Sequence, residues 1–178
     1  GLGQDDIVGG SSNFFSLNAR DQRPDGSDIV FGGAGTQIGR NNEALATGTT
    51  ATQRHARDAD TIVGDNGDIV RIVGVNGDDL IDNTPSRPYV TFGYDNYDAA
   101  SLNPMKIIVR GVTLVDYTPG GPDFKPVDAA LDIGGNDEVH GETGDDTAYL
   151  GKGNDIAYGE ADDDELIGGW GHDWISGG

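Results

Sequence analysis

The stretch DIGGNDEVHGETGDDTAYLGKGNDIAYGEADDDELIGGWGHDWISGG, residues 132–178, decides the fold of this chain. It divides without a gap into five lines of nine residues, and two glycines follow. Position six of every line is aspartate: Asp137, Asp146, Asp155, Asp164 and Asp173. Position eight is always apolar: Val139, Ala148, Ala157, Leu166 and Ile175. Position four holds Gly135, Gly144, Gly153, Asp162 and Gly171, so that Asp162 is the one departure from glycine.

Each line has the composition of a turn followed by a short strand. Glycines in the first half of the line adopt backbone angles that a side chain would forbid, and an aspartate at position six can close the turn. Positions seven to nine are extended, so the residue at position eight points inward while its two neighbours point outward. Asp162 is compatible with such a turn, because aspartate tolerates left-handed backbone angles better than most residues. We therefore expect a repeated turn-and-strand unit with one inward apolar row.

The pattern resembles the RTX (hemolysin-type) nonapeptide G-G-x-G-x-D-x-U-x, a calcium-binding repeat of secreted bacterial proteins. The resemblance implies an all-β fold, a right-handed parallel β-roll or β-solenoid in which successive nonapeptides form opposite sides of a flattened coil. It also implies Ca²⁺ between turns two repeats apart, held by position-six carboxylates and turn carbonyls. Carried over to this chain, the pairs are Asp137 with Asp155, Asp146 with Asp164, and Asp155 with Asp173, with the position-four residues in the same turns.

A looser form of the pattern recurs upstream, in GLGQDDIVGG (1–10), PDGSDIVFGGAG (24–35) and DADTIVGDNGDIVRIVGVNGDDLID (58–82). In the third segment Asp60, Asp68 and Asp79 each precede apolar residues, but their spacings are 8 and 11 rather than nine. We expect residues 1–82 to form degenerate coils of the roll, interrupted at 11–23 and 39–57 by polar segments that form loops or short helices. The candidate calcium ligands here are Asp5, Asp28, Asp60 and Asp79, and coils that stack without metal are an equally open alternative.

Residues 83–131 interrupt the repeats. Runs typical of strands lie at 89–92, 106–109 and 112–115, separated by Gly and Pro. We expect an inserted antiparallel β segment that packs on the roll. The predicted domains are therefore 1–82 with degenerate coils, 83–131 with the insert, and 132–178 with the regular calcium-binding roll.

Composition supports a hard cation as the partner. The chain has 31 acidic residues against 11 basic ones, a formal charge of −20, and by count 26 of the 31 are Asp. Aspartate with glycine is typical of tight turns, and carboxylate oxygens suit calcium. A charge of this sign disfavours nucleic acid, since a phosphate backbone requires Lys and Arg. There is no cysteine, and no apolar run approaches the length of a membrane span.

Folding of the regular repeats should depend on calcium. The inward row supplies roughly 10 kcal/mol at roughly 1.5–3 kcal/mol for each buried Val, Leu or Ile. Ordering each residue costs on the order of 1–2 kcal/mol of backbone entropy, and dozens of glycine-rich residues must be ordered. Each calcium site adds ~2.7 kcal/mol when the ion is present at about 100-fold over its dissociation constant. We expect a roll that is disordered at submicromolar calcium and folds at millimolar calcium outside the cell, and the resemblance implies type I secretion.

The sequence contains no motif of a hydrolase, zinc protease or phosphate-binding loop, and His55, His140 and His172 are scattered. We expect no catalytic activity. Two other functions stay open: an adhesin or glycan-binding module, and a protein that assembles head to tail into a calcium-dependent filament, matrix or surface layer. Gly1 begins inside a repeat and Gly177–Gly178 begins a new one, so we expect a part of a larger secreted protein.

Overall fold

The computed structural model describes residues 3–33, 58–74, 91–96, 106–116 and 132–178. These residues form strands and two short 3₁₀ helices, η1 (Asn13–Phe15) and η2 (Arg20–Gln22), with no α-helix among them. The prediction of an all-β fold is confirmed. Within the described ranges, no helix has the length and apolar character that a membrane crossing requires.

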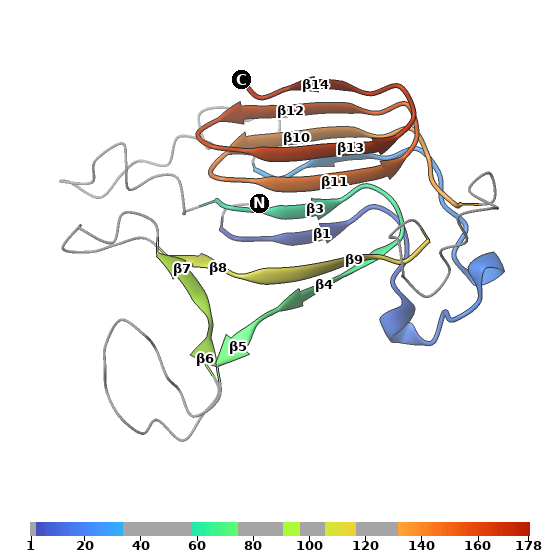
Figure 1. The fold of residues 1–178 in the computed structure, drawn as a ribbon, viewed down its shortest axis with the longest axis horizontal. Helices are drawn as coiled ribbons and strands as arrows, with labels where there is room; N and C mark the ends of the chain where they lie inside the picture. The colour runs from blue at the N-terminus through green and yellow to red at the C-terminus, as the bar shows by residue number, and fades with distance from the viewer. Residues whose placement is uncertain (1–2, 34–57, 75–90, 97–105, 117–131) are drawn as a thin grey trace.

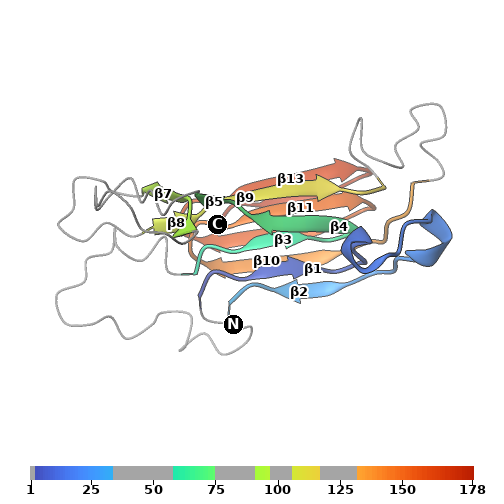
Figure 2. The same ribbon diagram turned by 90° about the horizontal axis from the view of Figure 1, so that it is seen from below.

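Eight strands form two parallel four-stranded sheets that face each other, here called the parallel stack (Figures 1 and 2). The first sheet has the order β1 (Asp6–Val8), β3 (Thr61–Val63), β11 (Thr147–Lys152), β13 (Glu165–Trp170). The second has the order β2 (Ile29–Phe31), β10 (Glu138–Thr143), β12 (Ile156–Ala161), β14 (Trp174–Ser176). The chain alternates between the two sheets, so each pair of consecutive strands forms one coil of the stack: β1 with β2, β3 with β10, β11 with β12, and β13 with β14.

The register confirms the inward apolar row. In one sheet Ile7, Ile62, Ala148 and Leu166 lie side by side, and in the other Val30, Val139, Ala157 and Ile175 do so. The buried members of both rows pack together between the sheets, and Leu150 of β11 joins them. Because the core is only one side chain wide on each sheet, most of the remaining contact between coils is made by main chain.

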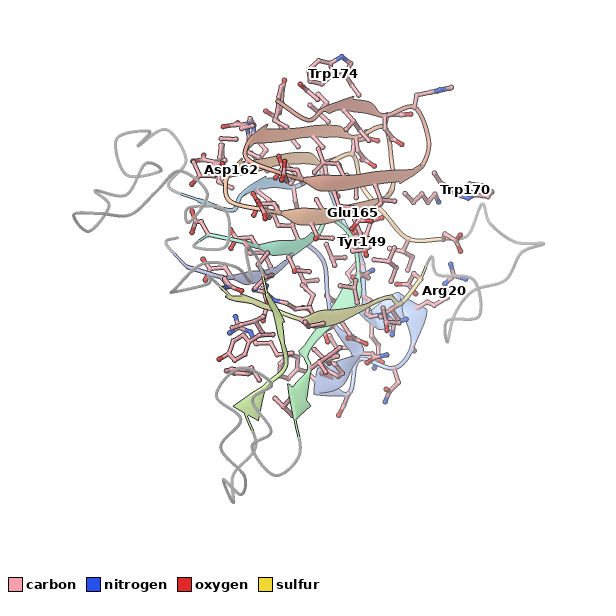
Figure 3. All side chains as sticks on the ribbon, turned by 60° about the vertical axis from the view of Figure 1, so that its left-hand side comes forward. Arg20, Tyr149, Asp162, Glu165, Trp170 and Trp174 are labelled. Carbon is pink, nitrogen blue, oxygen red and sulfur yellow. The ribbon has the colours of Figure 1, made fainter. Side chains whose placement is uncertain are left out.

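The residues on either side of the inward row point outward, as predicted. On the second sheet His140 stacks between Phe31 and Tyr158, with ring centroids 4.7 Å apart on both sides, and Tyr158 continues to Trp174 at 5.1 Å. Trp174 lies at the outer end of the stack, and 54% of its surface is exposed (Figure 3). The stack of Phe31, His140 and Tyr158 follows from the parallel register, which repeats position nine once per coil, whereas Trp174 lies at position seven and reaches Tyr158 diagonally.

The coils of the stack are interrupted by insertions of very different length. Successive position-six aspartates, from Asp5 to Asp28, Asp60 and Asp137, are 23, 32 and 77 residues apart, whereas all later ones are nine apart. The first insertion contains η1 and η2, and the third contains all of the antiparallel strands. The strand order is nevertheless regular across these insertions. After each insertion the chain adds the next strand to the sheet opposite the one that it left.

The antiparallel strands form three pairs. β4 (Gly67–Arg71) pairs with β9 (Arg110–Leu114), β5 (Val73–Gly74) with β6 (Thr91–Phe92), and β7 (Tyr94–Asn96) with β8 (Lys106–Ile108). Antiparallel strands were predicted near residues 89–92, 106–109 and 112–115. β4 and β9 lie next to β1 (Figure 1), where Arg71 and Arg110 form ion pairs with Asp6 at 2.6 and 2.8 Å.

One upstream prediction was wrong. The run after Asp68, expected to be a degenerate coil, forms β4 and pairs antiparallel with β9. Three residues separate Val63, the end of β3, from Gly67, the start of β4, and three also separate β11 from β12 across a turn of the stack. The length of the link therefore does not set the difference, and the antiparallel partner β9 takes the place that a neighbouring coil would have. Asp79, a candidate ligand in the same stretch, lies outside the described residues. The domain boundaries at 82/83 and 131/132 stay a prediction.

Candidate metal centres

The position-six aspartates form two columns. Each column lies along one sheet, at the edge where its parallel strands begin. The column before the first sheet is Asp5, Asp60, Asp146 and Asp164, and the column before the second is Asp28, Asp137, Asp155 and Asp173. Within a column, the Oδ1 atom of each aspartate accepts a hydrogen bond from the main-chain N–H of the aspartate one coil earlier. The six distances run from 2.7 Å for Asp60 N–H to Asp146 Oδ1 up to 3.2 Å for Asp155 N–H to Asp173 Oδ1.

This ladder brings together the three pairs inferred from the sequence. Asp137 and Asp155 are joined at 2.9 Å, Asp146 and Asp164 at 3.1 Å, and Asp155 and Asp173 at 3.2 Å. It also joins upstream aspartates to the regular repeats, through Asp28 with Asp137 and Asp60 with Asp146. The latter links could not be read from nine-residue spacing, because the insertions separate the partners.

The second carboxylate oxygen of five column aspartates is buried without a hydrogen-bond partner. Among the described residues, buried Oδ2 atoms without a partner occur on Asp60, Asp137, Asp146, Asp155 and Asp164. Asp60, Asp146 and Asp155 are each only 1% exposed, and Asp137 is 2% exposed. An ionised carboxylate that is buried without a partner is strongly unfavourable, so these oxygens indicate a missing positive charge.

Four of the five unpartnered oxygens face the first glycine of their own turns; the exception is Asp155, whose turn begins with Leu150. A Cβ atom on Gly141 would lie 2.5 Å from Asp146 Oδ2 and 2.9 Å from the carbonyl oxygen of Gly159 in the next coil. Glycine at position one therefore leaves open a space between a carboxylate and a main-chain carbonyl. Sequence reasoning emphasised position four and missed this role of position one, although glycine recurs there at Gly141, Gly159 and Gly168.

The position-four residues have a different role, because they allow the turns to approach one another. Gly144 and Gly171 have positive φ values of 118° and 139°, and Asp162 takes the same left-handed region at 84°. A side chain on Gly135 or Gly153 would overlap the carbonyl of the residue one coil earlier. The tolerance predicted for Asp162 matches its backbone angle. Participation of these five residues in metal binding stays a prediction.

Burial raises the pKa of five column aspartates, Asp60, Asp137, Asp146, Asp155 and Asp164. It is the largest cause of the rise to about 7 for Asp60 and to about 9 for Asp146, and the neighbouring carboxylates add to it. Burial likewise raises the pKa of Asp137 and of Asp164 to about 6. Both causes penalise negative charge, and a divalent cation between the turns would relieve both.

The neighbouring carboxylates of Asp65, which is buried, and Asp25, which is half-buried, were not predicted. Asp65 follows the first residue of an interrupted turn and accepts hydrogen bonds from the main-chain N–H groups of Gly135 and Lys152, at 2.9 and 2.6 Å. Burial, followed by a side-chain hydrogen bond with Asp25, raises the pKa of Asp65 to about 9. No sequence signal distinguished them, since neither occupies position six of a repeat.

The chemistry of the donors fits calcium. In the part of the chain that the structure describes, no three His, Asp or Glu side chains converge on one point. An ion in these turns would therefore take one or two carboxylates and complete its shell with main-chain carbonyls such as Gly159 O. Calcium accepts six to eight oxygen ligands of mixed type in flexible geometry, so it tolerates such a set.

Comparison with known proteins agrees with this geometry. The family model of the RTX calcium-binding nonapeptide repeat (4 copies) matches residues 133–166 and 149–178, which together make about a quarter of the chain. No curated protein and no solved structure matches the chain. Residues 133–178, which supply β10 to β14 and most of the two aspartate columns, thus belong to the RTX calcium-binding nonapeptide repeats, whose cofactor is Ca²⁺.

Proposed function

We propose that the parallel stack is a right-handed RTX β-roll that folds when calcium binds, outside the cell and as part of a larger secreted protein. The family match, the alternation of strands between two parallel sheets and the 18-residue spacing of paired aspartates support this proposal. Proteins with RTX repeats are typically secreted, and calcium is far more abundant outside the cell than inside. The route would be type I secretion.

The observation that carries the proposal is the row of buried Oδ2 atoms without partners on the column aspartates. Calcium supplies the positive charge that these carboxylates need in order to be buried in the ionised form. In the regular repeats the ligands would be the Oδ2 atoms of Asp137, Asp146, Asp155, Asp164 and Asp173 together with turn carbonyls. The Oδ1 atoms would keep their hydrogen bonds to the previous coil, so each aspartate would tie two coils and one ion together.

These residues give the module a role in folding rather than in catalysis. RTX repeats are generally structural and calcium-binding. The carboxylates at the turns are occupied by the main chain on one oxygen and face a glycine-lined space on the other. We infer that the module has no catalytic activity and that its output is a calcium-dependent change from an unfolded chain to a rigid stack.

A calcium titration followed by circular dichroism and by light scattering on the same samples tests the proposal. The expected result is a transition to β structure between micromolar and millimolar calcium, with unchanged molar mass. Magnesium is the matched control, since it demands near-octahedral geometry and releases its waters reluctantly. A spectrum that is identical in chelator and in millimolar calcium would overturn the proposal.

Assembly into a calcium-dependent filament is a second candidate function. The outward side chains of Trp170 and Trp174 are 52% and 54% exposed, and a second copy of the chain would find an aromatic surface there (Figure 3). A large increase of molar mass with calcium in the same titration would support assembly. The exchange of Trp174 for Glu should then keep the protein monomeric while the β signal persists.

A further inference from the structure

The three interrupted turns have the same construction at their base as the uninterrupted ones. Each insertion leaves the stack at the first glycine of a turn, at Gly9, Gly32 or Gly64, and returns at its position-six aspartate, at Asp28, Asp60 or Asp137. In the uninterrupted turn from Gly141 to Asp146, the same two positions are five residues apart.

The turn from Gly32 to Asp60 reproduces that uninterrupted turn closely. A Cβ atom on Gly32 would lie 2.6 Å from Asp60 Oδ2 and 2.9 Å from Gly141 O, against 2.5 and 2.9 Å for the equivalent atoms around Gly141. Asp60 is 1% exposed, and its Oδ2 atom has no hydrogen-bond partner among the described residues. The glycine is fixed to the next coil by a 2.9 Å hydrogen bond from its N–H to the carbonyl of His140.

The turn from Gly64 to Asp137 has the same features, although 72 residues lie between the two positions. A Cβ atom on Gly64 would lie 2.8 Å from the carbonyl oxygen of Leu150 and would overlap Asp137 Oδ2. Asp137 is 2% exposed, and its Oδ2 atom is also without a partner. At the turn from Gly9, Asp28 Oδ2 lies 2.8 Å from the Cβ position and the carbonyl of Gly64 lies beside it.

We propose that these three interrupted turns are calcium sites, and that each ion clamps the two ends of an insertion to the next coil of the stack. The proposal rests on calcium binding by the uninterrupted turns. It adds sites that combine residues far apart in sequence, Gly32 with Asp60 and Gly64 with Asp137, and the RTX family match begins only at residue 133. Calcium would then fold the repeats and also hold the insertions, with the antiparallel pairs among them, at fixed places on the stack.

A cation explains the shared construction better than hydrogen bonding alone. The entropy lost on closing a loop grows with its length, so a turn with 72 intervening residues needs a stronger tie than a turn with four does. The main-chain hydrogen bonding at the base does not grow with the insertion, because the N–H groups of Gly32 and Gly64 each bond to one carbonyl of the next coil although their insertions differ in length. The buried Oδ2 atoms supply the additional attachment point for an ion.

Glycine-to-alanine exchanges test the sites without removing a carboxylate. Gly32→Ala and Gly64→Ala should each lower the number of bound calcium ions by one, measured by equilibrium dialysis at saturating calcium. Gly26→Ala is the matched control, because nothing lies within 4 Å of its Cβ position, and it should bind the wild-type number. Gly141→Ala, in an uninterrupted turn, should also lose one ion.

Asp60→Asn is the second variant, in case an alanine prevents folding. Its amide oxygen can still accept the hydrogen bond from Asp5 N–H, but the charge is lost. It should lose one ion, and in calcium it should accelerate hydrogen exchange at residues 29–33 and 58–63 while residues 156–176 keep the wild-type rates.

The outcomes separate the two proposals. Loss of an ion in Gly141→Ala together with the full number in Gly32→Ala, Gly64→Ala and Asp60→Asn overturns the clamp and leaves the calcium-binding repeats standing. A wild-type protein that binds no calcium overturns the proposed function itself.

Discussion

The parallel stack and the antiparallel insertion bury acidic side chains in opposite ways. In the insertions Asp116 is 1% exposed, and the guanidinium of Arg23, itself fully buried, lies 2.9 Å away. Asp6, at the contact between the stack and β4–β9, is held by two arginines. In the columns of the stack, Asp146 and Asp155 are equally buried, yet their Oδ2 atoms have no partner among the described residues.

The difference shows which part of the molecule depends on an outside ion. A buried carboxylate needs a positive charge in either case, because leaving it alone costs several kcal/mol. Where the chain supplies its own guanidinium, the contact forms whatever the calcium concentration. Where the chain supplies only glycine and carbonyl groups, as in the columns, burial of the ionised carboxylate depends on a bound calcium ion. The same fold therefore contains a part that senses calcium and a part that does not.

Removal of calcium should have the largest effect. With several sites, each worth ~2.7 kcal/mol at about 100-fold excess of ion, the total is comparable to the whole stability of a small domain. We expect excess chelator at neutral pH to abolish the cooperative urea unfolding of the stack, followed by the fluorescence of Trp170 and Trp174. A cooperative transition of unchanged midpoint in chelator would show that the columns need no ion.

Acid should replace part of the effect of calcium. Asp60 and Asp146 have pKa values raised from 3.8 to about 7 and about 9 by burial and neighbouring charges. The folded metal-free protein therefore holds protons that the unfolded chain has released, so its stability is greatest below about pH 4 and falls as the pH rises toward 9. In chelator we expect β structure to return on acidification, measured by circular dichroism. At saturating calcium the trend should reverse, because protons then compete with the ion.

Arg23→Met should destabilise the protein independently of calcium. It leaves the buried Asp116 without its opposite charge and with only the hydrogen bond from Asn66 among the described residues, which costs about 3–5 kcal/mol. The fall in melting temperature should be the same at two calcium concentrations that both saturate the sites. Arg20→Met is the control, because Arg20 is 20% exposed and its distance to Asp132 is 3.5 Å, so its effect should be far smaller. If the loss of melting temperature in Arg23→Met disappeared as calcium rises, the Arg23–Asp116 contact would not be independent of calcium.

Asp146→Asn should have a smaller effect whose sign depends on the ion. In calcium it removes one site, about 2.7 kcal/mol at 100-fold excess, and the deficit should grow as calcium rises. In chelator above neutral pH it removes a carboxyl group that must take up a proton in order to be buried, so residual structure should increase rather than decrease. The exposed Asp163→Asn serves as control in the same melting experiments. Destabilisation of equal size in both conditions would assign Asp146 a purely structural role.

The sequence predicted the repeats well and the insertions poorly, for a physical reason. Within 132–178 both the inward row and the aspartate pairs follow from a period of nine, because each residue meets its equivalent 18 positions away. Asp60 meets Asp146 at a separation of 86, and no local pattern encodes that distance. Asp68 and Asp28 are both followed by Ile–Val, so composition could not separate a strand of the stack from β4.

The hydrogen-bond ladder also sets an order of events in time. The links Asp137–Asp155 and Asp155–Asp173 join residues 18 apart, whereas Asp28–Asp137 spans 109. Contacts of short sequence separation form faster, because less chain entropy is lost before they are made. The last coils should therefore nucleate folding and act as a template on which β3, β2 and β1 are added. Folding would then proceed from the C-terminal coils towards the N-terminus. Pulse-labelled hydrogen exchange after calcium addition would show protection at 156–176 before 58–63, and the reverse order would exclude such templating.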